Sequence, residues 1–530
     1  MGSVLGGPEL RYAADDAFEV PALIEVLSGD GAGSPVADVG PLSEGEVGRQ
    51  RLDATYFDTA DLRLAGAGLT LRRQTGGEDA GWHLQAAAGG TSRSEVRLPP
   101  GRVPPGRTPR VVPAPLESMV WARTLGERLQ PVARVTTERT VRRLSDATGR
   151  ILAEVTDDRV SGRRLLLVDE VTGAAGAETS WREIDVVLGD GAGGLGELMD
   201  ARLRARGLHE TPAASILAHV LGSRPTDPEP QEAPRPKPSS PAGDVLLAHL
   251  RQQVAQVQAQ DLPVRLDTPD SVHKMRVATR RLRSALTTFK SLFDPDVTRP
   301  LRDELKWLAG ELGAARDAEV MRDRVSDAVE DESHQLAVHA ETDARSELAE
   351  AYRAAHDRVL AELDGDRYHQ ILVALRALVD QPPLRKRAGR RAGKVLPPLV
   401  ARSFDRVRGF VAEAASRPPG AERDELMHDA RKAAKKARYA GEAVAPVFGK
   451  DATRFAAAME DVQEALGEHQ DSLLTRARLR TLAAHASSTE AAFVYGRLHA
   501  LEEARTEESQ RRFDAAWKAA RRTSVHRWLR

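Results

Sequence analysis

A proline-rich segment divides this chain and limits what can fold on either side of it. Seven of the twenty residues at 222–241 are proline, and none of the twenty is a large apolar residue. Proline fixes φ and has no backbone N–H, so such a stretch favours extended polyproline II over helix or central strand. We therefore expect a semi-rigid linker at 222–241 between two separately folded regions, residues 1–221 and 242–530.

The two regions carry different hydrophobic patterns. Before the linker, short runs such as LTLRRQT and WREIDVVL alternate in polarity and are bounded by Gly, Pro, Asp and Ser. After it, long segments rich in Ala, Leu, Arg and Glu repeat apolar residues at helical spacing. A series of period-two runs predicts an antiparallel barrel or sandwich. The expected fold class is therefore α+β multidomain, with a β N-terminal region and an all-α C-terminal region.

Composition narrows the available chemistry. The 530 residues include no cysteine, which excludes disulfides, thiolate catalysis and zinc–thiolate sites. No run of 18 apolar residues is present and the N-terminus lacks signal-peptide features, so we expect a cytoplasmic protein with no membrane partner. Basic and acidic residues nearly balance, at 77 and 78, so any charged partner must be recognised by a local patch.

The C-terminal region contains a duplication. The segment HKMRVATRRLRSALTTF begins at His273, and HDARKAAKKARYAGEAV begins 155 residues later at His428. LGAARD at 312–317 recurs as LGEHQD at 466–471, an offset of 154. Because the segments keep one order and nearly one offset, we expect two similar helical repeats, at about 242–385 and 392–530. Each is expected to be a four-helix unit, and the two are expected to pack about a pseudo-twofold axis.

Both copies place positive charge along one side of a helix, opposite an apolar side. At 100° per residue, these residues form one stripe in each copy: His273, Arg276, Arg280 and Arg283, and His428, Arg431, Lys435 and Arg438. A solvated surface is the ordinary explanation for such a stripe. Here Asp429 is the only acid within either stripe, which leaves little i,i+4 pairing, and the stripe occurs twice. We therefore expect a polyanion to bind where the two stripes face each other.

The residue types in the stripes bear on which polyanion binds. Tyr439 is their only aromatic residue, whereas binding of single-stranded nucleic acid uses several stacking platforms. The stripes hold no Asn or Gln for reading bases. Arg and Lys alone suit a ligand made entirely of phosphate. Histidines on both stripes predict tighter binding as the pH falls from about 8 to 6.

These motifs carry a family resemblance. Residues 242–530 resemble a CHAD domain, the conserved-histidine α-helical domain, through HKMRVATRRLR, LGAARD, HDARKAAKKARYAGE and LGEHQD. The resemblance implies a duplicated helical bundle that binds inorganic polyphosphate in a basic groove and needs no cofactor. It assigns polyphosphate binding to His273, Arg276, Arg280, Arg281, Arg283, His428, Arg431, Lys432, Lys435, Lys436 and Arg438. His469 stands within the second LGxxxD motif.

Residues 1–221 resemble a CYTH domain, the triphosphate tunnel metalloenzyme fold. The resemblance rests on LDATYFDTADLRLAGAGLTLRRQTGG, GWHLQ, SEVRLP, LAEVTDDRV and WREIDVVL. It implies an eight-stranded antiparallel tunnel in which basic residues hold a triphosphate and acidic residues hold Mg²⁺ or Mn²⁺. The implied triphosphate-binding residues are Arg11, Arg72, Arg97 and Arg134. The implied metal ligands are Glu9, Glu154, Glu183 and Asp185, and the catalytic candidates are Glu9, Arg11 and Glu183.

Several positions depart from the CYTH pattern. Gly7 stands where the first acid of a Glu-x-Glu-x-Lys signature is expected, and Arg11 replaces its lysine. Gln74, Gln85 and Ile216 replace tunnel cations, and no lysine occurs before Lys237. A tunnel that lacks these charges is expected to hydrolyse triphosphate poorly.

The sequence therefore predicts a cytoplasmic polyphosphate-binding protein, and recruitment to polyphosphate granules is a further hypothesis. Two alternatives stay open. One is a metal-dependent inorganic triphosphatase that the helical region supplies with polyphosphate or that acts on another phosphorylated small molecule. The other is nucleic-acid binding by the same stripes.

Overall fold

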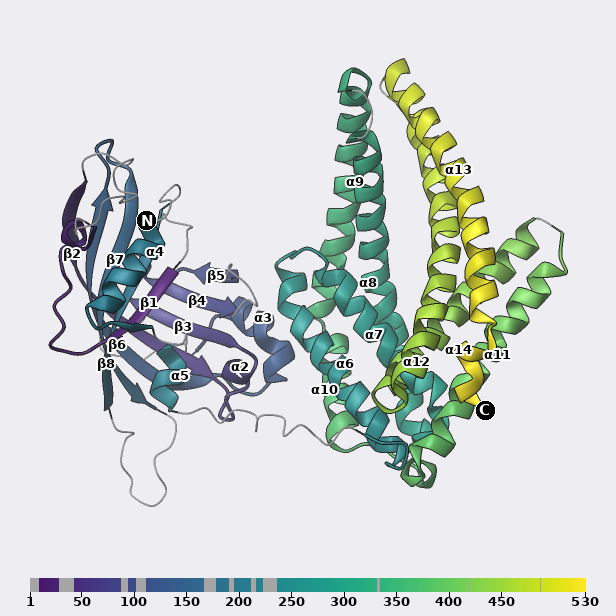
Figure 1. Ribbon diagram of the computed structural model, residues 1–530, viewed down its shortest axis with the longest axis horizontal. Helices are drawn as coiled ribbons and strands as arrows, with labels where there is room; N and C mark the ends of the chain where they lie inside the picture. Colours follow the sequence, from purple (N-terminus) through teal and green to yellow (C-terminus); the bar gives the residue numbers. More distant parts are fainter. Residues whose placement is uncertain are drawn as a thin grey trace. The chain divides into compact units, whose positions relative to one another are not determined.

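The computed structural model describes residues 9–27, 42–86, 94–101, 111–165, 178–189, 195–210, 216–222, 236–330, 334–418, 420–486 and 488–530 (Figure 1). Most of the predicted linker, residues 223–235, lies outside them. The chain divides into two compact units, Met1–Pro230 and Gln231–Arg530. We call them the sheet unit and the helical unit.

The sheet unit holds one antiparallel sheet, and its described part contains nine strands in the order β5-β4-β3-β2-β6-β7-β8-β1-β9. The strands are β1 (Glu9–Ala14), β2 (Ser43–Asp58), β3 (Leu69–Thr75), β4 (Gly81–Ala86), β5 (Ser94–Leu98), β6 (Gln130–Ser145), β7 (Ile151–Arg164), β8 (Glu178–Leu188) and β9 (His209–Glu210). The helices are α1 (Leu23–Leu27), α2 (Arg63–Gly66), α3 (Ala114–Thr124), α4 (Leu195–Ala205) and α5 (Ile216–Leu221). The resemblance implies eight strands; the additional one is the two-residue β9, which pairs with β1.

Alternation along the strands gives the sheet two faces with different coverings. On the outer face, Tyr12, Ile184 and Val186 are buried in one apolar cluster with residues of α1 and α4. On the inner face, Tyr56 and Val160 are buried with residues of α5. The inner face is the tunnel-like side, and α5 covers only part of it.

A glycine fixes the turn between β3 and β4. Gly76 has φ +82°, and a Cβ there would lie 2.0 Å from the backbone oxygen of Arg51. Only a residue without a side chain fits this left-handed, crowded position. The start of the turn therefore lies close against β2, next to the end of β3.

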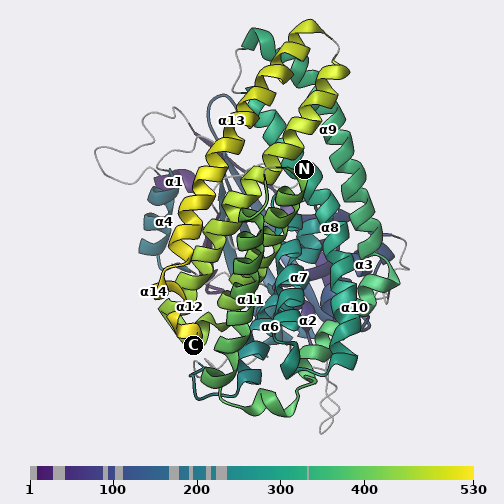
Figure 2. The same cartoon turned by 90° about the vertical axis from the view of Figure 1, so that its right-hand side faces the viewer.

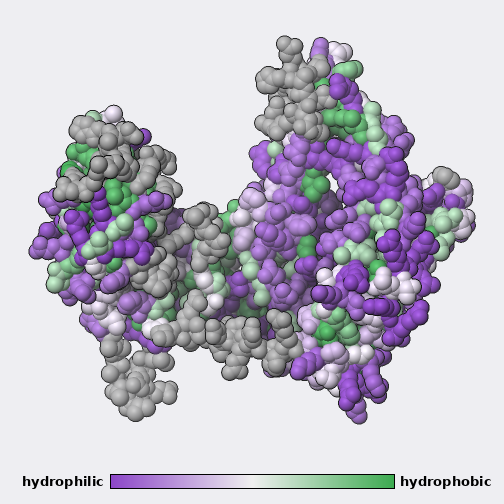
Figure 3. All heavy atoms as spheres, in the orientation of Figure 1, coloured by the Kyte–Doolittle hydropathy of each residue, from purple (hydrophilic) through white to green (hydrophobic). Residues whose placement is uncertain are grey.

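The helical unit contains α6 (Ala242–Arg265), α7 (Ser271–Thr288), α8 (Pro295–Glu330), α9 (His334–Leu363), α10 (Asp366–Asp380), α11 (Ala392–Ala415), α12 (Ala421–Ala484), α13 (Thr489–Ala520) and α14 (Thr523–His526). None of its described helices is long and apolar enough to cross a membrane, and neither is any described helix of the sheet unit. The face of the helical unit visible in Figure 3 is mostly hydrophilic.

The order of helices repeats as the duplication predicts. Helices α6 and α11 each span 24 residues and start 150 residues apart. Helix α12 is interrupted at Gly449, whose φ of 53° and ψ of −131° are not helical. Its part before Gly449 therefore corresponds to α7 and its part after it to α8, while α13 corresponds to α9. The pairs α8–α9 and α12–α13 form two long hairpins (Figures 1 and 2).

The two hairpins share an apolar core. Val325 of α8 and Leu348 of α9 are buried in one cluster with Leu479 of α12 and with Tyr495 and Leu498 of α13. Residues from both repeats thus close one core, which fixes how the repeats lie against each other.

Candidate functional site: a basic face on two equivalent helices

Helices α7 and α12 carry the two predicted stripes on one basic face. We define the basic face as His273, Arg276, Arg280, Arg281 and Arg283 of α7 with His428, Arg431, Lys432, Lys435, Lys436 and Arg438 of α12. The opposite side of each helix is buried: Met275 and Leu282 in α7, and Ala430 and Ala437 in α12. Burial of these apolar residues directs the charged side chains outward.

The recurring LGxxxD motif anchors one arginine in each repeat. Arg276 pairs with Asp317 at 3.5 Å, and Arg431 pairs with Asp471 at 3.8 Å. A Cβ on Gly313 would lie 3.5 Å from the Arg276 guanidinium. A Cβ on Gly467 would lie 3.0 Å from the Arg431 guanidinium. The motif's glycine therefore leaves room for the guanidinium and its aspartate holds it.

The two stripes adjoin. Burial lowers the pKa of Lys435 to about 7, and the charges of Arg280, Arg431 and Arg276 add to the effect. Burial also lowers the pKa of Lys436, helped by Arg406 of α11 and by Arg283. Cations of one helix thus lie near enough to disfavour the charge on the other, and the two helices form one positively charged surface.

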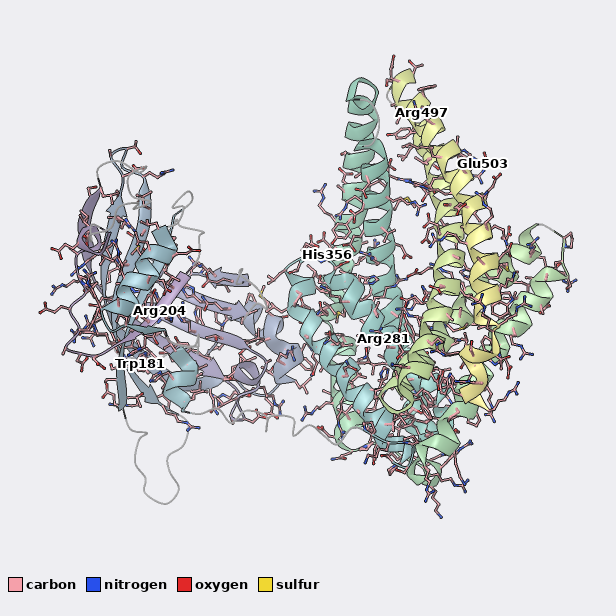
Figure 4. The ribbon with its side chains drawn as sticks, in the orientation of Figure 1. Trp181, Arg204, Arg281, His356, Arg497 and Glu503 are labelled. Atoms are coloured by element: carbon pink, nitrogen blue, oxygen red, sulfur yellow. The ribbon has the colours of Figure 1, made fainter. Side chains whose placement is uncertain are left out.

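Carboxylates from outside the stripes neutralise part of this surface. Arg281 pairs with Glu442 at 2.8 Å, where α7 meets α12 (Figure 4). Arg438 pairs with Glu442 at 2.8 Å and with Glu460 at 2.7 Å. The sequence showed Asp429 as the only acid within the stripes, but this count underestimated how many of the basic residues are paired. Glu442 lies one helical turn beyond Arg438, and Glu460 comes from the part of α12 after Gly449, so both lie outside the stripes.

Within the described residues, four basic side chains of the basic face form no ion pair: Arg280, Arg283, Lys435 and Lys436. Burial and the neighbouring Arg280 lower the pKa of Arg283. Half-buried cations that repel one another are poised to accept an anion.

The histidines are not equivalent in the two repeats. His428 contacts Oε1 of Gln470, which also accepts a hydrogen bond from Arg431 at 3.1 Å. At the matching place of the first repeat stands Arg316, and burial with this nearby charge lowers the pKa of His273. His469 contacts Ser509 of α13 at 3.5 Å instead of joining the basic face.

The inner face of the sheet unit gathers most of the predicted tunnel residues. Strand register places Arg11, Arg72, Arg97, Glu154, Glu183 and Asp185 on this face. Arg134 pairs with Thr55 and Arg163, and it is offset by one residue from the positions of β6 that face inward. Its exposed side chain therefore lies on the outer face. Glu9 lies in β1, but its side chain is outside the described residues.

Most arginines of the inner face form ion pairs with carboxylates. Arg11 pairs with Asp185 at 2.7 Å, and Arg97 pairs with Glu95 at 2.6 Å. Two further arginines of β6, which sequence reasoning missed, make the same kind of pair. They are Arg139 with Asp158 at 2.6 Å and Arg143 with Glu154 at 2.7 Å. Arg139 and Arg143 stand four residues apart in TERTVRR, which places both on one face of a strand, and this spacing was the available signal.

Gln85 and Ile216, which stand where the CYTH resemblance implies cations, are uncharged and make contacts within the sheet unit. Gln85 donates a hydrogen bond to Glu95 at 2.8 Å, and His83 contacts the same carboxylate at 2.9 Å. The hydrogen bond from His83 lowers the pKa of Glu95 to about 2, with help from Arg97 and Gln85. Ile216 packs within the apolar cluster around α5. These positions hold the sheet together and add no free positive charge.

The described side chains of the inner face do not form a ready metal site. Among the described residues, no group of three or more His, Asp or Glu side chains is placed to hold a metal ion. Glu154 and Asp185 are engaged by arginines, and Glu183 accepts a hydrogen bond from Trp181 Nε1 at 2.7 Å. Mg²⁺ needs several free oxygen ligands, so these carboxylates as arranged do not fit it.

A cavity of about 650 Å³ lies beside Glu183 in the sheet unit. Trp181 of β8 (Figure 4) and His219 of α5 line it, and their ring centroids are 4.0 Å apart. Its other charged lining residues, among them Arg51 and Glu138, include both signs. The cavity therefore lacks the excess of cations that a triphosphate needs.

Comparisons with known proteins agree with this division. A CYTH domain family model matches residues 41–178, and a CHAD domain family model matches residues 248–480. Two uncharacterized proteins of Mycobacterium tuberculosis, from strains CDC 1551 / Oshkosh and ATCC 25618 / H37Rv, are each 36% identical to this chain. Each match covers 484 residues, 88% of this chain and 89% of the relative.

Solved structures give two further similarities. PptA from Streptomyces chartreusis is 25% identical, with a TM-score of 0.44, over 53% of this chain and 100% of its own. The CHAD domain from the plant Ricinus communis is 22% identical, with a TM-score of 0.42, over 54% of this chain and 93% of its own. From the two family matches and the relatives that span most of its length, the chain belongs to the family of proteins that join a CYTH domain to a CHAD domain.

Proposed function

We propose that this protein binds inorganic polyphosphate through the basic face of its CHAD domain. The observation that carries the proposal is the group of unpaired cations contributed by both repeats: Arg280 and Arg283 of α7 with Lys435 and Lys436 of α12. A chain of phosphates offers one negative charge per unit and many acceptor oxygens, and it relieves the repulsion among these cations.

The anchored arginines support a ligand that crosses both helices. Arg276 and Arg431 are each held by one aspartate at 3.5 Å or more, and neither Nε has a hydrogen-bond partner within the described residues. An anion can take up such donors without breaking a short ion pair. Polyphosphate lying along the face would contact equivalent groups of both repeats in turn.

The surroundings of Tyr439 argue against nucleic acid as the ligand. Its side chain is buried, and the guanidinium groups of Arg281 and Arg438 lie 5.6 and 5.9 Å from its ring centroid. A base cannot stack on a ring that is already enclosed. Phosphate groups alone therefore account better for the side chains on this face.

We propose further that the CYTH domain has little triphosphatase activity. Support comes from the ion pairs that engage Arg11, Arg139 and Arg143, since a triphosphate would have to displace a carboxylate at each. Arg72 is the exception. Its buried Nε has no partner within the described residues, and this favours a second candidate function, binding of a triphosphate-like anion or its metal-dependent hydrolysis in the tunnel.

A binding and hydrolysis assay on residues 242–530 and 1–221 separately tests both proposals. The CHAD domain should bind polyphosphate, and the CYTH domain should release little phosphate from tripolyphosphate with Mg²⁺ or Mn²⁺. Competition between nucleic acid and polyphosphate for residues 242–530 tests the remaining alternative, and effective displacement by nucleic acid would count against the proposal.

A further inference from the structure

Glu442 connects the two repeats across the basic face. Its Oε2 accepts a hydrogen bond from Arg281 Nε at 2.9 Å, and its Oε1 accepts one from Arg438 Nε at 2.8 Å. Only 23% of its side chain is exposed. Glu460 contacts the same Arg438 at 2.7 Å. Two arginines and two glutamates therefore balance in charge, and we call this group the closed end of the face.

The positions equivalent to Glu442 and Glu460 in the other repeat are not acidic. At the offset of 155 residues, Arg281 corresponds to Lys436, Arg438 to Arg283, and Glu442 to Thr287. The hydroxyl of Thr287 donates to the backbone oxygen of Arg283 at 2.7 Å and brings no charge. At the offset of 154, Glu460 corresponds to Lys306.

A further cation lies at that place. Arg406 of α11 is near enough to contribute to the lowered pKa of Lys436, as Arg283 is. The residue 150 positions earlier is Gln256, which is uncharged. We call the group Arg283, Lys436 and Arg406 the open end. The duplicated scaffold is thus equivalent in backbone and unequal in charge.

We propose that Glu442 is an internal counter-ion that excludes polyphosphate from the closed end and confines it to the centre and the open end of the basic face. The inference rests on the proposed function and deepens it, because it assigns which half of a nearly symmetric surface is occupied. It makes Glu442 a specificity-determining residue that limits how many phosphates are bound at once.

The two ends differ in the free energy that a bound phosphate gains. At the closed end, phosphate must replace a carboxylate that already satisfies two guanidinium groups, so little is gained. At the open end, Lys436 is repelled by Arg406, Arg283 and Lys432, and Asp429 offsets this repulsion only in part, so a phosphate gains more there. The equivalent positions themselves supply two basic residues at either end, Arg281 with Arg438 and Arg283 with Lys436, so the ends differ mainly in the presence of Glu442.

Reciprocal variants of the full chain test the proposal. Glu442→Gln keeps an acceptor and removes the charge, and it should tighten binding of long-chain polyphosphate on the order of tenfold, the size of one charge-assisted hydrogen bond. Thr287→Glu places a carboxylate four residues after Arg283, the spacing of Arg438 and Glu442, and it should weaken binding by a similar factor. Thr287→Gln is the neutral control and should bind as the parent does.

Salt dependence gives a second readout. Each added phosphate contact steepens the slope of log affinity against log salt by about one unit, so Glu442→Gln should steepen it and Thr287→Glu should flatten it. Equal slopes and affinities in all variants, with unchanged melting temperatures, would overturn the proposal. If Glu442→Gln melts early, Arg281→Gln with Arg438→Gln replaces it, and this pair should weaken binding less than Arg283→Gln with Lys436→Gln. A parent chain that binds no polyphosphate would instead refute the proposed function.

Discussion

The inner face of the CYTH domain and the basic face of the CHAD domain both display arginine, yet they treat its charge in opposite ways. In the sheet, Arg11, Arg139 and Arg143 each have a carboxylate on the neighbouring strand at 2.6 to 2.7 Å. On the helices, Arg280 and Arg283 have none within the described residues. An arginine that already has a carboxylate partner offers less to an anionic ligand than one without a partner, so the number of basic residues alone does not identify a binding site.

Reversal of charge on the helices should have the largest effect. Arg280→Glu with Arg283→Glu should reduce polyphosphate affinity on the order of 100-fold or more. Two side chains that attract phosphate would then repel it, at the place where the basic side chains form no ion pairs. Lys435→Glu with Arg438→Glu should also cause a large loss. Titration with labelled long-chain polyphosphate measures both. If either pair left affinity unchanged, the surface would be built from one repeat only.

Catalysis in the sheet domain should be weak. Each missing preorganised charge costs about 100-fold to 1000-fold in rate, and Gln74, Gln85 and Ile216 stand where the resemblance to a CYTH domain implies cations. Phosphate release from tripolyphosphate by residues 1–221 should therefore stay close to background with Mg²⁺ or Mn²⁺. Robust metal-dependent release that Glu183→Ala abolishes would make the domain an enzyme and contradict this expectation.

Removal of one arginine from each face should affect stability unequally. Arg139→Ala leaves the buried Asp158 carboxylate, only 4% exposed, without its partner, and it should lower the free energy of unfolding by about 2 kcal/mol. Arg283→Ala removes a cation that its neighbours repel and should change that free energy by less than about 0.5 kcal/mol. Denaturant unfolding of the full chain, followed separately for the two domains, distinguishes the cases. Equal losses would contradict the contrast between the faces.

The smallest expected effect is the change of stability and of polyphosphate affinity with pH, and Lys435 should cause it. Its pKa of about 7 lies below the ordinary value of 10.5, mainly through burial and then through Arg280. The unfolded chain therefore binds more protons between these values, so stability of the CHAD domain should rise with pH from about 7 to 10.5. A bound anion favours the charged amine, so polyphosphate binding should tighten several-fold as the pH falls through about 7.

Of the two histidines predicted to cause this pH effect, His273 is less suited to it. Burial and Arg316 lower its pKa, which disfavours the protonated form. Lys435→Arg should flatten the binding profile measured with long-chain polyphosphate, and His273→Gln should leave it unchanged. The reverse result would return the role to the histidine.

The fold class could be predicted from the sequence because its patterns are local. Alternation along WREIDVVL predicted a strand, and β8 spans Glu178–Leu188. The duplicated segments predicted two helical repeats, and α6 and α11 start at matching residues. These signals depend only on period and offset, which the chain itself carries.

The same reasoning missed features that depend on tertiary register. Arg134 was assigned to the tunnel, but one residue of register places it on the other face. Glu460 lies beyond the interruption at Gly449, so its contact with Arg438 depends on how α12 turns there. Glu442 stands four residues after Arg438, a helical spacing that an i,i+4 search extended past the stripe would have found.

The most direct test of the central claim is polyphosphate binding by residues 242–530 as a function of salt. We predict tight binding at low ionic strength and a steep loss as salt rises, because several phosphate contacts release counterions together. Residues 1–221 under the same conditions should bind far more weakly, since most of their inner-face arginines are already paired. Absence of binding to residues 242–530, or binding that salt does not weaken, would contradict the account.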